Sequence, residues 1–198
     1  MSTQTRKYEL KARAESQRET RERIAAAAAG LHQEKGVAHT TVAEIARRAG
    51  VTRLTVYNHF ADLSELLPAC SAHHATLHPP PDLDSVFALD DPAERVRVAL
   101  TRLYGFYRET EPMFGNLFSD RAFVPELNRF MEQGIDRMSG ELADRLAAGF
   151  SIRGRRAERL NALTHLAVDF WTWRRLSREG LDDEAAAELM GAAIVAHG

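Results

Sequence analysis

Residues 40–67, TTVAEIARRAGVTRLTVYNHFADLSELL, decide the fold of this chain of 198 residues. Thr41 and Glu44 have the spacing of a capping box, in which each side chain accepts a hydrogen bond from a backbone amide that the helix leaves unpaired. Val42, Ile45 and the alanines that follow make the next residues a short amphipathic helix. Gly50 then ends that helix, because glycine adopts the left-handed conformation at little cost.

A second short helix follows after a tight turn. Thr52 has the position of its N-cap, and the helix is predicted over residues 53–59. Two short helices joined by a glycine-containing turn are typical of a helix-turn-helix unit. The second helix would bury Val51, Val56 and Phe60 and would present its other side chains to a groove of double-stranded DNA.

The exposed side chains of this unit have the chemistry that DNA recognition requires. An arginine can donate two hydrogen bonds to guanine, an asparagine can pair with adenine, and a leucine or threonine methyl can contact thymine, while hydroxyl and ring N–H groups suit phosphates. The alternative is that they form only the solvated face of a helical bundle. The expected DNA-binding residues are Thr40, Thr41, Arg53, Leu54, Thr55, Tyr57, Asn58 and His59.

These residues resemble the N-terminal module of the TetR family of transcriptional regulators. The matching positions are Thr41, Ile45-Ala46, Ala49-Gly50-Val51-Thr52, Tyr57, His59-Phe60 and Leu66-Leu67. The resemblance implies an all-α homodimer that binds an inverted-repeat operator and carries a small-molecule effector in its C-terminal domain. Two positions depart from the family pattern: Leu54 stands where glycine is usual, and Leu63 where a phosphate-binding lysine is usual. At Leu63 this chain therefore lacks one phosphate contact that the family pattern implies.

The N-terminal segment is charged and poor in apolar side chains. We interpret residues 1–19 as a flexible arm, which could serve as a basic tail for phosphates. A helix is expected from about Thr20, with Ile24, Ala28 and Leu31 on one face and Gly36 at its end. Up to Leu67 the chain has a net charge of +3 and beyond it −5, a mild asymmetry that alone says little about partners.

The remainder of the sequence has helical periodicity and no period-two strand pattern. We expect about nine helices in an all-α protein, with a helix-turn-helix domain at 20–67 and an effector and dimerisation domain at 68–198. The helix that starts at Asp62 joins the two domains, so it is the expected lever between them. Further helices are predicted from residue 91 and over residues 125–148, 154–178 and 182–196.

Aromatic and methionine side chains are frequent in the second domain. Such residues more often form core than a binding site, but the family resemblance implies an internal effector pocket. The expected polar groups in that pocket are those of Tyr104, Tyr107, His165, Asp169 and Trp173.

The predicted helix 154–178 is apolar on two sides and therefore needs cover on both. A partner subunit would supply one cover, and an intramolecular sandwich is the alternative. The last helix is rich in small residues, and the family resemblance implies a homodimer formed by the last two helices. The expected interface residues are Leu163, Ala167, Phe170, Leu189 and Ala193.

Other classes of protein find little support in the sequence. It contains no phosphate-cradling glycine loop and no hydrolase or metalloprotease motif, and His165 with Asp169 has a simpler explanation as a packed polar pair. We expect no cofactor. Cys70, His74 and His78 recur every four residues but lack a fourth ligand, so no metal site is expected. No apolar segment suits a signal peptide or a membrane span, which favours the cytoplasm.

The sequence therefore predicts a DNA-binding transcriptional regulator, with repression released by a small molecule. One alternative is a regulator that acts without a ligand. Another is a helical ligand-binding protein or enzyme that has lost DNA binding, for which Leu63 is the best support.

Overall fold

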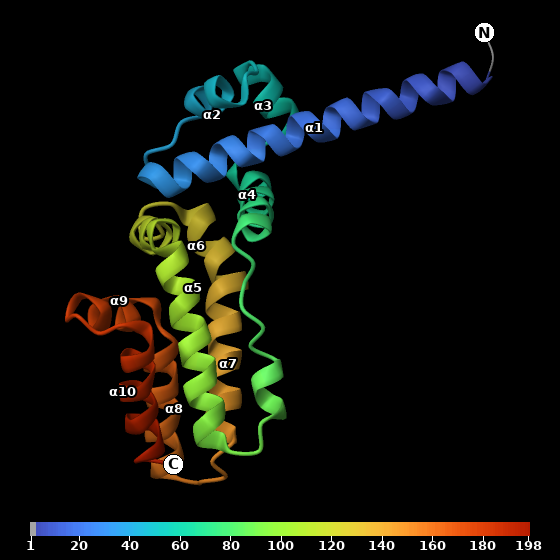
Figure 1. The fold of residues 1–198 in the computed structure, drawn as a ribbon. Coiled ribbons are helices and arrows are strands. Elements are labelled where there is room, and N and C mark those ends of the chain that lie inside the picture. Colours follow the sequence, from blue (N-terminus) through green and yellow to red (C-terminus); the bar gives the residue numbers. More distant parts are fainter. Residues whose placement is uncertain (1–2) are drawn as a thin grey trace. The chain divides into compact units, whose positions relative to one another are not determined.

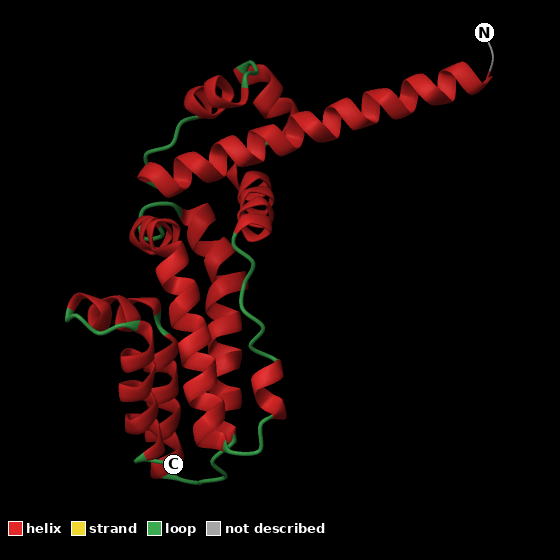
Figure 2. Ribbon diagram, viewed as in Figure 1, coloured by secondary structure: helices red, strands yellow, loops and turns green. Residues whose placement is uncertain are grey.

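The computed structural model describes the backbone of residues 3–198 and, before residue 10, the side chain of Tyr8 alone. Figure 1 gives the order of the elements, and Figure 2 shows that every regular element in this range is helical. The elements are α1 (Thr3–Lys35), α2 (Val42–Ala49), α3 (Arg53–His59), α4 (Leu63–Leu77), the 3-10 turn η1 (Ser85–Ala88), α5 (Pro92–Asp120), α6 (Pro125–Met131), the π-helical turn η2 (Glu132–Asp136), α7 (Arg137–Ala148), α8 (Arg155–Val168), α9 (Phe170–Arg178) and α10 (Asp183–Val195).

The prediction of an all-α protein is confirmed. Within the described range the number of helices is nine if α6, η2 and α7 are taken as one uninterrupted helix. None of these helices is long and apolar enough to cross a membrane. The chain divides into two compact units: unit 1 contains residues 1–79 and 115–130, and unit 2 contains residues 80–114 and 131–198. The whole of α4 lies in unit 1, whereas α5 and α6 each contribute residues to both units.

Unit 1 is built around the C-terminal half of α1, which packs against α2 and α4. Ile24 and Ala28 of α1 are completely buried, and Val56 and Phe60 are almost so. The same core takes up Leu63 at the start of α4. An apolar residue at that position therefore has a packing role in this chain.

The first helix begins at Thr3 rather than near Thr20, so the expectation of a flexible arm over residues 1–19 is wrong for the part that the structure describes. Alanine, glutamate, lysine and arginine dominate this segment, and all four favour helix. Arg18 also forms ion pairs with Glu15 and Glu22 one turn away on either side, an arrangement that supports exposed helices.

The last turn of α5 belongs to unit 1 and holds the C-terminal end of α1. The Asn116 side-chain amide donates to the carbonyl oxygens of His32 (3.0 Å) and Gln33 (2.9 Å). The buried Asp120 carboxylate accepts a hydrogen bond from the Ala38 amide, 3.0 Å away. These bonds join the last turn of α5 to backbone groups at and just after the C-terminal end of α1.

Gly36 makes this close approach possible. Its φ of +88° is in the left-handed region, which other residues rarely adopt. A Cβ atom at this position would also collide with the Asp120 carboxylate. The glycine that the sequence places at the end of the first helix is therefore required for packing against α5 as well as for the turn.

In unit 2, the predicted single helix over residues 154–178 is two helices, α8 and α9, separated at Asp169. The hydroxyl of Tyr104 donates to the Ala167 carbonyl (2.7 Å), and that of Tyr107 to the Val168 carbonyl (2.8 Å). The Asp169 carboxylate caps α9 by accepting from the Thr172 amide. The break is stable because side chains satisfy the backbone groups freed on both sides of it.

The buried His32 makes the stability of unit 1 depend on pH. Burial lowers the pKa of His32 from its ordinary 6.5 to about 4, and the nearby Asp120 offsets this only in part. Between those two pH values the unfolded chain binds a proton that the folded chain does not, so the free energy of unfolding falls as the pH falls. We expect a loss of about 3 kcal/mol over this window.

This loss is measured by urea unfolding at a series of pH values. The variant His32→Gln removes the titrating group, and its free energy of unfolding should vary much less with pH over the same window. Equal slopes for the variant and the parent chain would show that His32 is not the group responsible.

Candidate nucleic-acid interface

The capping box predicted at the start of α2 is present. The Thr41 hydroxyl accepts a hydrogen bond from the Glu44 amide (3.3 Å), and the Glu44 carboxylate accepts one from the Thr41 amide (3.0 Å). Lys35 lies 2.6 Å from the other Glu44 oxygen. The hydrogen bonds from Lys35 and then Thr41 lower the pKa of Glu44 to about 2, so the box stays ionised. Gly50 ends the helix with a φ of +67°.

The short helix α3 is fixed at both ends. At its N-terminus the Thr52 hydroxyl accepts from the Thr55 amide, 3.1 Å away. At its C-terminus the Arg21 guanidinium of α1 donates to the His59 carbonyl and stacks 3.9 Å from the centroid of the Phe60 ring. A cation at this end also interacts favourably with the helix dipole. Seven residues would not hold a helix in water alone, so α3 depends on these anchors and on the burial of Val56 and Phe60 in the core of unit 1.

Four of the predicted DNA-binding residues form an exposed face on α3. Arg53 and Asn58 are exposed, and Arg53 forms no ion pair with any other side chain that the structure describes. Leu54 and Tyr57 expose 69% and 54% of their surfaces. Two large apolar side chains beside an arginine and an asparagine on one short helix suit contact with another molecule.

The remaining four predicted residues support the backbone of the unit. The Thr40 hydroxyl donates to the Gly36 carbonyl (2.6 Å), and that of Thr41 belongs to the capping box. The Thr55 hydroxyl lies 2.8 Å from that of Thr52, and His59 is half-buried. The structure therefore separates four exposed side chains on α3, those of Arg53, Leu54, Tyr57 and Asn58, from four at the edges of the unit.

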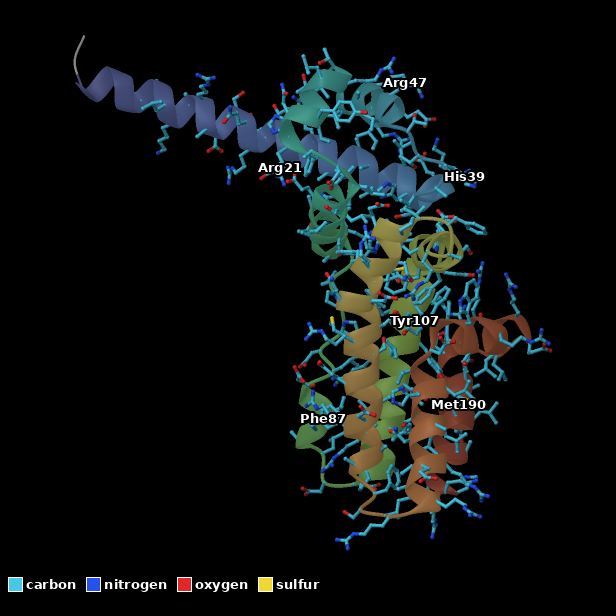
Figure 3. All side chains as sticks on the ribbon, turned by 180° about the vertical axis from the view of Figure 1, so that it is seen from behind. Arg21, His39, Arg47, Phe87, Tyr107 and Met190 are labelled. Carbon is cyan, nitrogen blue, oxygen red and sulfur yellow. The ribbon has the colours of Figure 1, made fainter. Side chains whose placement is uncertain are left out.

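The two adjacent arginines of α2 differ in their surroundings. Arg48 makes two hydrogen bonds of 2.7 Å to the Glu34 carboxylate. Arg47 is exposed, projects outward from α2 (Figure 3), and has no ion pair within the described residues. Of these two arginines, Arg47 is therefore the one that offers an uncompensated charge to a phosphate.

Arg21 is the important residue that sequence reasoning missed. It precedes the buried Ile24 by three residues and so lies on the side of α1 that packs against the other helices of unit 1. Figure 3 shows it where α1 meets the other helices of unit 1. The three-residue spacing from Arg21 to the buried Ile24 could have identified Arg21. It is easily overlooked because Arg21 lies in a highly charged segment and arginines are common on helix surfaces.

The predicted effector residues lie in unit 2, and their polar atoms bond within the fold. Tyr104, Tyr107 and Trp173 are buried, and the Trp173 indole donates to the Asp183 carboxylate (3.0 Å). Asp169 lies at the α8–α9 break beside the two tyrosines. His165 is apart from this group: it is exposed and pairs with Asp144. Of the five predicted effector residues, the structure brings four together: Tyr104, Tyr107, Asp169 and Trp173.

The predicted dimer residues also divide into two sets. Ala167 and Phe170 are buried inside the single chain, so they cannot contact a partner directly. Leu163 and Ala193 are half-buried and Leu189 is 51% exposed. The exposed Leu166 of α8, which belongs to the other apolar side of the predicted helix 154–178, adds to this face.

Cys70 belongs to the core of unit 1, and burial raises the pKa of its thiol to about 12. A protonated, buried thiol is a poor metal ligand. Within the described residues no group of three or more histidine, cysteine or acidic side chains is arranged to hold a metal ion.

Comparison with known proteins agrees with this geometry. Residues 24–70 match the family described as bacterial regulatory proteins, tetR family. The transcriptional regulator TtgR of Pseudomonas putida is 47% identical over 55 residues, which are 28% of this chain and 26% of TtgR. The sequence match thus spans about a quarter of that relative's length.

Two solved structures share the fold over nearly the full length. NalD, the secondary repressor of the MexAB-OprM multidrug efflux pump in Pseudomonas aeruginosa, has a TM-score of 0.60 at 24% identity, covering 92% of this chain and 97% of NalD. AibR, solved in complex with isovaleryl coenzyme A and operator DNA, has a TM-score of 0.63 at 21% identity, covering 87% and 97%. Residues 24–70 are therefore a domain of the tetR family type, and the likeness to NalD and AibR extends the shared fold over nearly the whole chain.

Proposed function

We propose that this protein is a transcriptional repressor that binds an inverted-repeat operator as a homodimer and leaves it when a small molecule binds to unit 2. The observation that carries the DNA-binding part is the exposed face of α3, a helix anchored at Thr52 and at Arg21. Anchored in this way, the helix presents Arg53, Leu54 and Asn58 without further ordering on binding.

The residues of this face have different roles. Arg53 and Leu54 lie in the first turn of α3, the part of a recognition helix that contacts base edges. Arg53→Ala should weaken binding by about 1 to 3 kcal/mol and relax the preference at one base pair, because a bidentate contact to guanine is lost. Tyr57→Phe should weaken binding to all duplexes by a similar factor, since a phosphate contact carries no base identity.

The measurement is a competition assay at fixed salt with duplexes that the parent protein selects from a random-sequence pool. Arg97→Ala, an exposed arginine of unit 2, is the matched control and should leave affinity and preference unchanged. A parent protein that selects no duplex would exclude DNA binding. An unchanged preference in Arg53→Ala would remove Arg53 as the residue that reads a base.

The homodimer is proposed from the apolar face that α8 and α10 expose. Leu166 and Leu189 each expose 51% of their surfaces, and Leu163 and Ala193 are half-buried. The buried Ala167 would support this face from beneath. Such a face on two adjacent helices is suited to a second copy of itself, as a two-fold interface requires.

Leu166→Glu should weaken the dimer at least about tenfold, because it places an unpaired charge in a dry interface. Leu166 is exposed in the single chain, so the change should not unfold it. Leu77→Glu, at a leucine that is 63% exposed on α4, is the matched control. Sedimentation at micromolar concentration measures the dimerisation of both variants and of the parent protein. A monomeric parent protein would contradict the proposal.

The effector proposal is supported by the aromatic cluster of unit 2. The rings of Tyr107, Phe114, Phe170 and Trp173 lie with centroids 5.4 to 5.9 Å apart, a setting for the apolar part of a ligand. Burial raises the pKa of Tyr107, so its hydroxyl remains a donor. At present the Tyr107 hydroxyl donates to the Val168 carbonyl. A ligand with an acceptor group that replaced this carbonyl as the partner of Tyr107 would remove a bond that stabilises the α8–α9 break.

AibR, whose complex contains an acyl thioester, suggests the first probes. We expect isovaleryl coenzyme A, or another short acyl compound in a panel, to lower DNA affinity at least about tenfold through its differential affinity for two conformers. Tyr107→Phe should reduce this response and leave DNA affinity without ligand unchanged. DNA affinity that no compound alters would favour the ligand-independent regulator.

A further inference from the structure

The N-terminal half of α1 is an exposed helix that stays outside the core of unit 1, and Arg21 near its end contacts the end of α3. Its described side chains from Tyr8 to Arg23 are exposed except for Thr20, and the first buried one is Ile24. Figure 1 shows this half of α1 extending beyond α2, α3 and α4 of the same unit. These 16 residues span about 24 Å at the rise of an α-helix.

The charges on this half are divided between two sides of the helix. At about 100° per residue, Arg13, Arg21, Arg18 and Lys11 fall, in that order, within an arc of about 160° that contains no acidic residue. Glu15, Glu19 and Glu22 follow one another at spacings of four and three residues and lie outside that arc. Arg23 is the one described basic residue on the acidic side, and it bonds to Thr20.

The basic side is the side on which α3 lies. Arg21 belongs to it and contacts the His59 carbonyl and the Phe60 ring at the end of α3. Ile24 and Ala28, which continue the same side along α1, are buried in unit 1. The basic surface therefore begins beside the recognition helix and runs away from it along α1.

Part of this charge is uncompensated within the fold. Lys11 and Arg13 form no ion pair with any side chain that the structure describes. Arg18 pairs with Glu15 and Glu22 at the border of the two sides, but these exposed pairs are weak and exchange readily. A partner with closely spaced negative charges would be attracted along the length of this surface.

We propose that the basic side of α1, defined by Lys11, Arg13, Arg18 and Arg21, binds the phosphate backbone of the duplex that flanks the base pairs contacted by α3. The proposal rests on the proposed function, because α3 must be on DNA for α1 to reach the flank. About 24 Å of helix spans about seven base pairs of one strand. Each half-site would then require flanking duplex beyond the base pairs that are read.

The test compares two double variants with the same change in net charge. Lys11→Gln/Arg13→Gln removes two positive charges from the basic side. Ala12→Glu/Ser16→Glu adds two negative charges on the other side of the same helix. Their affinities are measured by fluorescence anisotropy at several salt concentrations, on a duplex selected by the parent protein and carrying long flanks, and on the same duplex trimmed to the footprint of α3.

On the long duplex, Lys11→Gln/Arg13→Gln should bind about tenfold more weakly than the parent, and its salt dependence should fall by about two released counterions. On the trimmed duplex the two proteins should bind alike, which also shows that the variant is folded. The Ala12→Glu/Ser16→Glu control should stay close to the parent on both.

Two results would overturn the proposal while leaving the proposed function intact: equal affinity of the parent for long and trimmed duplexes, or equal losses in both double variants. A parent protein that binds neither duplex would remove the proposed function, and this proposal with it.

Discussion

The arrangement of unit 1 depends on how the last turn of α5 closes the end of α1. Asn116 and Asp120 form three hydrogen bonds with backbone groups on either side of Gly36, and the absent Cβ of Gly36 leaves room for the Asp120 carboxylate. The buried half of α1 in turn holds α2 and α4 and, through Arg21, the end of α3. The orientation of the exposed face on α3 therefore depends on bonds that α5 supplies.

Local sequence signals predicted the features that are local in their physics. Thr41, Thr52 and Asp62 cap their helices as expected, because a cap needs only residues two or three positions apart. The division of residues 154–178 into two helices was missed. The side chains that stabilise the break, Tyr104 and Tyr107, lie about 60 residues away in the sequence, and no periodicity within the helix reveals them.

The same distinction explains what could be predicted of the candidate interface. The residue types and the helix that carries them were predictable from residues 40–67. Sequence reasoning did not reveal which hydroxyls are already used, as those of Thr40 and Thr55 are, or that Glu34 compensates Arg48 while Arg47 has no ion pair within the described residues. Each of these features depends on a neighbouring residue whose position is known only from the folded unit.

The structure also changes which helix connects the two units. The sequence favoured the helix that starts at Asp62, but α4 lies wholly in unit 1, whereas α5 and the uninterrupted helix α6–η2–α7 each contribute to both units. Pro112, two residues before the point where α5 passes into unit 1, lacks the amide that would bond to the Arg108 carbonyl, so the helix bends there more easily than elsewhere. Tyr104 and Tyr107 lie on the unit 2 side of this proline, and Asn116 and Asp120 on the unit 1 side. The same helix thus supplies the hydroxyl groups that stabilise the α8–α9 break and the side chains that hold the end of α1.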